Sequence, residues 1–130
     1  MSKGLHNVGA YRKSLQLFDH VIEDTKPLKS DFTLTGLLSQ QIASADSVCA
    51  NIEEGYGRLS RKEYIRFLDY AIASARETQG RYTRLKHWID PSVLKRRNAL
   101  LDEIIGILSS TIKTLRSQPA VKEESTEYTV

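Results

Sequence analysis

Regularly spaced cations are the residues of this chain best suited to binding chemistry. Arg58, Lys62 and Arg66 recur every four residues, so on a helix they form one stripe. Each cation can contact a phosphate group, which gives affinity for nucleic acid without readout of base sequence. The predicted nucleic-acid-binding residues are Arg58, Arg61, Lys62, Arg66, Arg81 and Arg84.

The charge is unevenly distributed along the chain. The formal net charge is only +3, but residues 56–89 hold eight Lys or Arg against three acids, whereas residues 31–55 hold four acids and no Lys or Arg. No aromatic platform, recognition-helix signature or zinc knuckle accompanies the basic half. The pattern therefore leaves two interpretations open: an anionic partner such as RNA or DNA, or an ordinary solvated helix face on which Glu77 and Arg81 pair internally.

Catalytic and metal-binding constellations are not apparent in the sequence. The three histidines are far apart and lack the paired spacing of metal ligands. Glu53 and Glu54 are neighbours, so on a helix their side chains diverge and make a poor acid–base pair. Cys49 lies between apolar residues, which indicates a buried thiol. We therefore predict a protein that is not an enzyme, with no catalytic residues, metal or cofactor.

Composition indicates one globular unit. The chain has 130 residues, is 40% hydrophobic and 27% charged, and contains one cysteine, so it cannot form an internal disulfide. Its N-terminus lacks the apolar run of a signal peptide, and no window approaches the 18 apolar residues of a membrane span. We expect a cytoplasmic protein without a membrane partner.

The first two of four amphipathic segments fill residues 8–22 and 34–52. The first is expected to end near Thr25, because Pro27 disfavours helical geometry at Lys26. Asp31 or Thr33 is the candidate N-cap of the second segment. Gly55 or Gly57 is expected to end it with a positive φ.

The third and fourth segments are longer. Ser60 and Glu63 form a capping-box pattern, after which apolar residues at helical spacing predict a helix that continues to Ile89. Asp90 and Pro91 predict the start of the last helix, and Pro119 its end. We predict a helical domain over residues 1–118 and a disordered polar tail over residues 119–130.

Short connections make consecutive helices antiparallel. The predicted fold is therefore all-α, an antiparallel up-down-up-down four-helix bundle. The third helix has more apolar surface than one core seam requires, because Ile65, Phe67, Ile72 and Trp88 lie off its main apolar line. This surplus indicates either a homo-oligomer or a wide core-facing stripe.

One motif resembles a known family. Residues 47–58 read S-V-C-A-N-I-E-E-G-Y-G-R and resemble the S-I-P-A-N-I-A-E-G-Y-G-R motif of the bacterial four helix bundle protein family, also called the 23S rRNA intervening-sequence-encoded protein family. The similarity continues through Ser60, residues 62–68, Ala71, Ser74 and Glu77. It covers about residues 8–116.

The resemblance implies a cytosolic four-helix bundle without an established biochemical role. Members of the family, and the similar accessory proteins of diversity-generating retroelements, form homopentamers with a basic surface, and those accessory proteins contact a reverse transcriptase and nucleic acid. An assembly adaptor for such a protein partner is therefore the alternative to a nucleic-acid-binding protein. Positions that match the family motif are expected to be structural or interfacial: Asn51, Glu54, Gly55, Glu63, Phe67 and Glu77.

Two positions depart from the family pattern. Cys49 stands where the motif has proline, which predicts a weaker kink in the second helix. The arginine-rich element that precedes the motif is replaced by residues 41–45, Q-I-A-S-A, which contain no basic residue. This second departure removes positive charge from the second helix.

Overall fold

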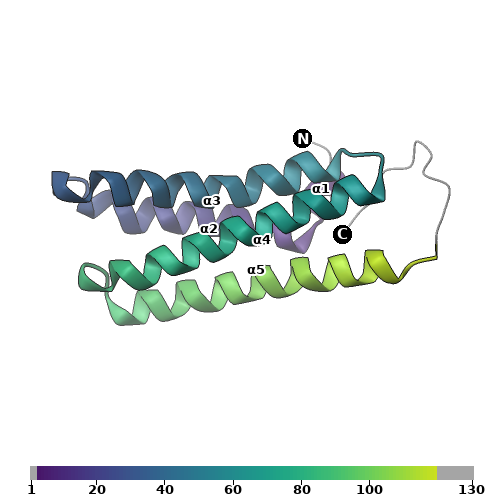
Figure 1. Ribbon diagram of the computed structural model, residues 1–130. Helices are drawn as coiled ribbons and strands as arrows, with labels where there is room; N and C mark the ends of the chain where they lie inside the picture. Colours follow the sequence, from purple (N-terminus) through teal and green to yellow (C-terminus); the bar gives the residue numbers. More distant parts are fainter. Residues whose placement is uncertain (1–2, 120–130) are drawn as a thin grey trace.

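The structure is a computed structural model that describes residues 3–119, and the regular elements in that range are all helical (Figure 1). The predicted tail, apart from Pro119, lies outside the described residues. The elements in chain order are α1 (Lys3–His6), α2 (Gly9–Thr25), the 3₁₀ turns η1 (Lys26–Leu28) and η2 (Phe32–Leu34), α3 (Thr35–Tyr56), α4 (Arg61–Arg84), the 3₁₀ turn η3 (Leu85–His87) and α5 (Pro91–Ser117).

The four long helices form an antiparallel bundle, as predicted. Helix α3 packs against α2 and α4, and α5 closes the bundle by packing against α4 and α2 (Figure 1). One continuous apolar core runs through all four helices, and a small second cluster joins Leu34, Leu38 and Leu85 at one end. No helix within the described range has both the length and the hydropathy needed to cross a bilayer.

Helix α4 begins where the sequence predicted but ends earlier. Ser60 Oγ accepts a hydrogen bond from the backbone N–H of Glu63 at 3.3 Å, so Ser60 is the N-cap. The predicted α-helix to Ile89 is wrong at its C-terminal end, because the chain tightens into a 3₁₀ turn after Arg84. The core positions of α4 and η3 are nevertheless buried as predicted: Tyr64, Leu68, Ala71, Ala75, Thr78, Tyr82 and Leu85.

The expected role of the two glycines is also wrong. Gly57 follows α3 with φ −83° and ψ 0°, and no described glycine has a positive φ. Gly55 instead lies inside α3 at a close helix crossing. A Cβ atom built on Gly55 would lie 2.9 Å from Phe67 Cβ and 3.1 Å from Tyr64 Cδ1. Glycine is therefore required at this position by the distance between α3 and α4.

The remaining helix ends agree better with the sequence. Asp90 Oδ1 accepts from the backbone N–H of Ser92 at 2.8 Å, and Pro91 is the first residue of α5. Asp31 caps the short turn η2 rather than α3 itself. Helix α2 ends at Thr25 as predicted. The expected effect of Pro27 on the preceding residue is wrong, however, because Lys26 keeps α geometry with φ −55° and ψ −46°.

A buried ionic cluster connects three helices at one end of the bundle. Asp24 of α2 accepts hydrogen bonds from Arg97 of α5 at 2.7 and 2.9 Å and from Tyr82 Oη of α4 at 2.6 Å. Burial opposes ionisation of Asp24, but the hydrogen bonds from Arg97 and Tyr82 outweigh it and lower its pKa. Burial and the hydrogen bond to Asp24 raise the pKa of Tyr82. The charged carboxylate is therefore part of the folded state.

Candidate nucleic-acid interface

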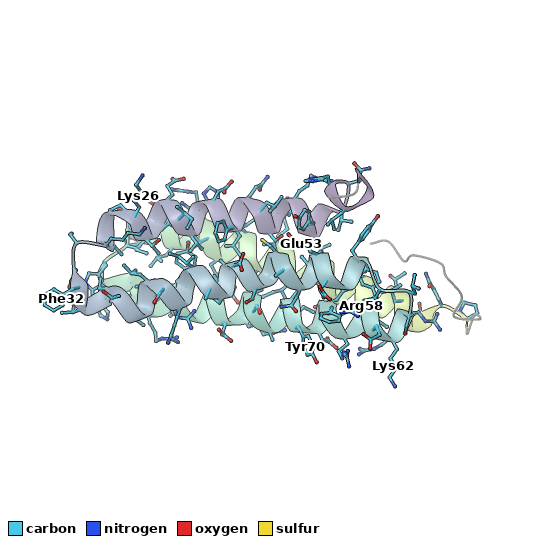
Figure 2. All side chains as sticks on the ribbon, turned by 90° about the horizontal axis from the view of Figure 1, so that it is seen from above. Lys26, Phe32, Glu53, Arg58, Lys62 and Tyr70 are labelled. Atoms are coloured by element: carbon cyan, nitrogen blue, oxygen red, sulfur yellow. The ribbon has the colours of Figure 1, made fainter. Side chains whose placement is uncertain are left out.

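The six predicted phosphate-binding residues lie at two separate ends of α4. Arg58 is in the turn before the helix, and Arg61, Lys62 and Arg66 are in its first turns. Arg81 and Arg84 belong to its last turn, so about 20 Å of helix separates the two groups. Figure 2 shows Arg58 and Lys62 at one end of the bundle, with Lys26 and Phe32 at the opposite end.

Arg58 and Arg66 are held by acids of their own chain. Arg58 Nη2 pairs with Glu54 Oε1, and Arg66 Nη2 donates to both carboxylate oxygens of Glu63 at 3.0 Å. Both guanidinium groups also lie over the ring of Phe67, with Cζ 4.9 and 5.6 Å from its centroid. The positive charge of this edge is therefore largely compensated, which argues against a phosphate site at Arg58 and Arg66 alone.

Arg81 lies inside the bundle and not on the predicted surface. Its side chain is 7% exposed, and Nη1 donates to Gln41 Oε1 at 3.1 Å and to Ser44 Oγ at 3.0 Å. Glu77 approaches Nη2 at 3.8 Å. Arg81 joins α4 to α3 and is not available to a ligand, so we remove it from the candidate set. Arg84, by contrast, is exposed.

The positions predicted to be structural or interfacial cluster mainly where α3 meets α4. Gly55 permits the close crossing there, and Phe67 packs beside it while its ring contacts that of Tyr70 edge-on at 5.6 Å. Asn51 Nδ2 donates to the Ser47 carbonyl at 2.8 Å within α3. The three predicted acids each contact an arginine: Glu54 with Arg58, Glu63 with Arg66 and Glu77 with Arg81.

A groove lined by three basic residues lies where the start of α4 faces the end of α5. Arg61, Lys62, Ile65 and Arg116 line a hollow of about 370 Å³. An adjoining hollow of about 470 Å³ shares three of these residues and is also lined by Ser60, Glu63, Arg66 and Asp69. Arg116 Nη2 lies 3.7 Å from Asp69 Oδ2, and both side chains are more than half exposed. We call the first of these hollows, lined by Arg61, Lys62, Ile65 and Arg116, the α4–α5 groove.

The α4–α5 groove brings together two predicted residues and one that the sequence analysis missed. Arg61 and Lys62 were predicted, whereas Arg116 is 50 residues away from Arg66 along the chain and was not singled out. The signal that identifies it is topological. In an antiparallel bundle, the last turn of α5 lies beside the first turn of α4, so a cation just before Pro119 must approach the Arg61 end.

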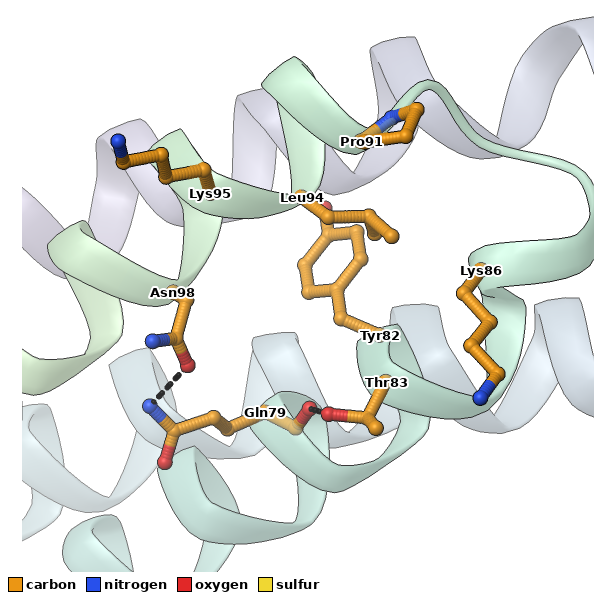
Figure 3. A pocket seen from close by; sticks show the side chains of 8 residues that line it. All are labelled: Gln79, Tyr82, Thr83, Lys86, Pro91, Leu94, Lys95 and Asn98. Atoms are coloured by element: carbon orange, nitrogen blue, oxygen red, sulfur yellow. Dashed lines mark hydrogen bonds between the residues drawn. The ribbon is translucent and has the colours of Figure 1, made fainter.

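A third hollow, of about 330 Å³, lies between α4 and α5 at the opposite end (Figure 3). Its lysines, Lys86 and Lys95, lie on opposite sides, and their ammonium groups point away from each other in Figure 3. Gln79 Nε2 donates to Asn98 Oδ1 at 2.8 Å, which bridges the two helices. Two diverging cations do not converge on one anion, so this hollow is the weaker candidate site.

Other reactive groups are engaged in the fold. Cys49 is buried and its thiol donates to the Ser14 carbonyl at 3.3 Å; burial raises its pKa, so the unreactive thiol form is favoured. Burial and a 2.8 Å hydrogen bond to Glu53 raise the pKa of Tyr11. Within residues 3–119, no group of three or more His, Cys, Asp or Glu side chains is placed to hold a metal ion.

Comparison with known proteins identifies the family. The family model of the 23S rRNA-intervening sequence protein matches residues 6–110. The chain belongs to this family. A crystal structure of a protein of unknown function from the S23 ribosomal protein family, from Bacteroides thetaiotaomicron VPI-5482, is similar with a TM-score of 0.75 and 27% identity, over 80% of this chain and 98% of that one. No curated protein matches the chain. The family match ends before Arg116, so one wall of the α4–α5 groove lies outside it.

Proposed function

We propose that this protein is a non-enzymatic, homo-oligomeric binding protein that holds the phosphate backbone of RNA or DNA in the α4–α5 groove. The observation that carries the proposal is the convergence of three basic side chains on this groove. Arg61, Lys62 and Arg116 line it around the apolar side chain of Ile65. The Arg116–Asp69 pair is long and exposed, so it offers little resistance to a phosphate that competes for the guanidinium.

The groove suits a phosphate chain better than a single small anion. Guanidinium groups bind phosphate oxygens in pairs of hydrogen bonds, and the ammonium group of Lys62 adds a point charge. The first turn of α4 adds the partial positive charge of a helix N-terminus. Three phosphate contacts predict that affinity falls roughly 20- to 40-fold between 50 and 200 mM salt.

Oligomerisation is the second part of the proposal. The α3-facing edge of α4 presents Phe67 and Tyr70 beside Arg58 and Arg66, whose charges are compensated. Tyr70 is exposed and Phe67 is half-buried. Aromatic and arginine side chains with little net charge are typical of protein–protein contacts. We propose that this edge joins copies of the chain, as a pentamer in line with the family resemblance. Repeated grooves would then bind one nucleic acid with avidity.

The test is retention of a structured RNA on the immobilised protein at 50 and 200 mM salt. Lys62→Glu and Arg116→Glu are expected to weaken binding and to reduce the salt dependence by about one phosphate contact each. Arg76→Glu is the matched control, because it makes the same charge change on an exposed position of α4 outside the groove. Equal losses in all three variants, or no retention at 50 mM salt, would refute the groove as a phosphate site.

Arg84 remains a predicted phosphate contact at the far end of α4. An Arg84→Glu variant belongs in the same assay, since it asks whether a long RNA spans both ends of the bundle. If Arg84→Glu weakens RNA binding as much as Lys62→Glu does, the binding site extends along α4. Binding unchanged at Arg84 would confine it to the groove.

An assembly adaptor remains the alternative, and one observation favours it. The Phe67–Tyr70 edge is aromatic and nearly neutral, which suits a protein partner, such as a reverse transcriptase, at least as well as another copy of the chain. Genomic position discriminates the two. A neighbouring reverse transcriptase gene with template and variable repeats supports the adaptor, whereas a reading frame inside a ribosomal RNA gene supports the RNA-binding role.

A further inference from the structure

We infer that the acidic segment formed by residues 120–130 binds in the α4–α5 groove of its own chain and competes there with nucleic acid. The docking itself follows from the groove and the sequence. The competition rests on the function proposed above. The segment reads A-V-K-E-E-S-T-E-Y-T-V and contains one lysine against three glutamates.

The chain leaves α5 at the groove. Helix α5 ends at Ser117, and Gln118 is extended with φ −67° and ψ 145°. Arg61 Nη1, on the groove wall, donates to the carbonyls of Gln118 at 3.4 Å and Pro119 at 3.3 Å. The last described residue is therefore already in contact with a residue that lines the groove.

Chain length permits the contact. Glu123 lies four positions after Pro119, a separation of at most about 14 Å in an extended chain. Lys62 lines the same hollow as Arg61, so its ammonium group is within reach of Glu123 and Glu124. Lys95 lies 24 residues before Pro119 in α5, about 36 Å along the helix, and is beyond the reach of these two carboxylates.

Charge selects the groove as the site for this segment. Glu123 and Glu124 are consecutive carboxylates, and the groove offers Arg61, Lys62 and Arg116. A segment tethered this closely has an effective concentration of about 1–10 mM, so an intrinsic dissociation constant of about 1 mM would keep it bound half of the time or more. Removing its charges is expected to tighten RNA binding roughly two- to tenfold.

The direct test is zero-length carbodiimide cross-linking of the full chain, followed by peptide mass spectrometry. Amide bonds between Lys62 and Glu123 or Glu124 are expected in the monomer band, and none to Lys95. A Glu123→Gln/Glu124→Gln variant must lose them. Absence of the Lys62 cross-link, or its appearance only in covalent dimers, would overturn docking within one chain.

The competition is tested separately by RNA binding. The Glu123→Gln/Glu124→Gln variant should bind more tightly than Asp19→Asn/Asp46→Asn, which removes two exposed acids from α2 and α3. If both double variants bind RNA more tightly by the same factor, the effect is one of net charge, and the proposed competition is wrong. If the cross-link forms but no variant binds RNA, the docking stands and the proposed function fails. If RNA binds but the cross-link is absent, the proposed function stands and the docking fails.

Discussion

Replacing Gly55 with alanine tests the most demanding contact of the fold. The new Cβ atom would lie 2.9 Å from Phe67 Cβ, whereas carbon atoms in contact normally lie about 3.5–4.0 Å apart. Phe67 Cβ is fixed to the backbone of α4 and cannot rotate away. Helices α3 and α4 must therefore separate by several tenths of an ångström along the whole crossing.

The cost follows from two opposing effects. Overpacking of this kind costs about 1–3 kcal/mol. Alanine is favoured over glycine by about 1 kcal/mol inside a helix, but Gly55 is next to the last residue of α3, where that gain is smaller. We expect Gly55→Ala to lower the free energy of unfolding by about 1–2 kcal/mol, which corresponds to roughly 4–8 °C in Tm for a chain of this size.

Gly106 provides the matched control. It lies in the middle of α5 on the exposed side, and a Cβ built there meets nothing within 4 Å. Gly106→Ala is therefore expected to raise the free energy of unfolding by up to about 1 kcal/mol, the full helix preference. The assay is thermal and urea unfolding followed by circular dichroism. A Gly55→Ala protein as stable as wild type would show that the close crossing does not constrain the helices.

Two further predictions concern the buried ion pair and the proposed interface. Asp24→Asn should lower the free energy of unfolding by about 3 kcal/mol, because it leaves the Arg97 charge without its partner. Folding lowers the pKa of Asp24, so the charged carboxylate stabilises the fold above about pH 4, which is its pKa in the unfolded chain. This stabilisation is lost as the pH falls through the folded-state pKa. The difference in Tm between wild type and Asp24→Asn should therefore shrink below about pH 4 and vanish in strong acid. Tyr70→Arg should reduce a wild-type mass that is a multiple of 14.7 kDa to that of one chain, measured by light scattering, without a change in helix content.

The architecture could be predicted because helix formation leaves a local signal. Apolar residues at spacings of three and four mark the buried face of a helix regardless of its partner. The end of α4 could not be located in this way, since a 3₁₀ turn keeps nearly the same spacing and Leu85 stays in a core with Leu34 and Leu38. That contact joins residues about 50 positions apart, and no local pattern encodes it.

The fate of Arg81 shows why the site was harder to predict than the fold. In the sequence Arg81 resembles Arg84, its neighbour in the same helical turn. Its burial depends on Gln41 and Ser44 of α3, which accept its hydrogen bonds. These acceptors belong to residues 41–45, which contain no basic residue. A basic side chain there would repel Arg81, so the neutral character of this segment permits the burial of Arg81.

The two edges of α4 differ in charge, and that difference separates two modes of binding. Toward α3, Arg58 and Arg66 are each compensated by an acid and lie over Phe67, so this edge can be buried against protein at low electrostatic cost. Toward α5, Arg61, Lys62 and Arg116 line one groove, and the acids beside it are Asp69 and Glu63. Burial of these three cations against protein would be costly, whereas contact with phosphate is favourable. In the proposed assembly, contact through the first edge would leave the second edge open in every copy, so one helix could serve both the proposed oligomer contact and the proposed anion groove.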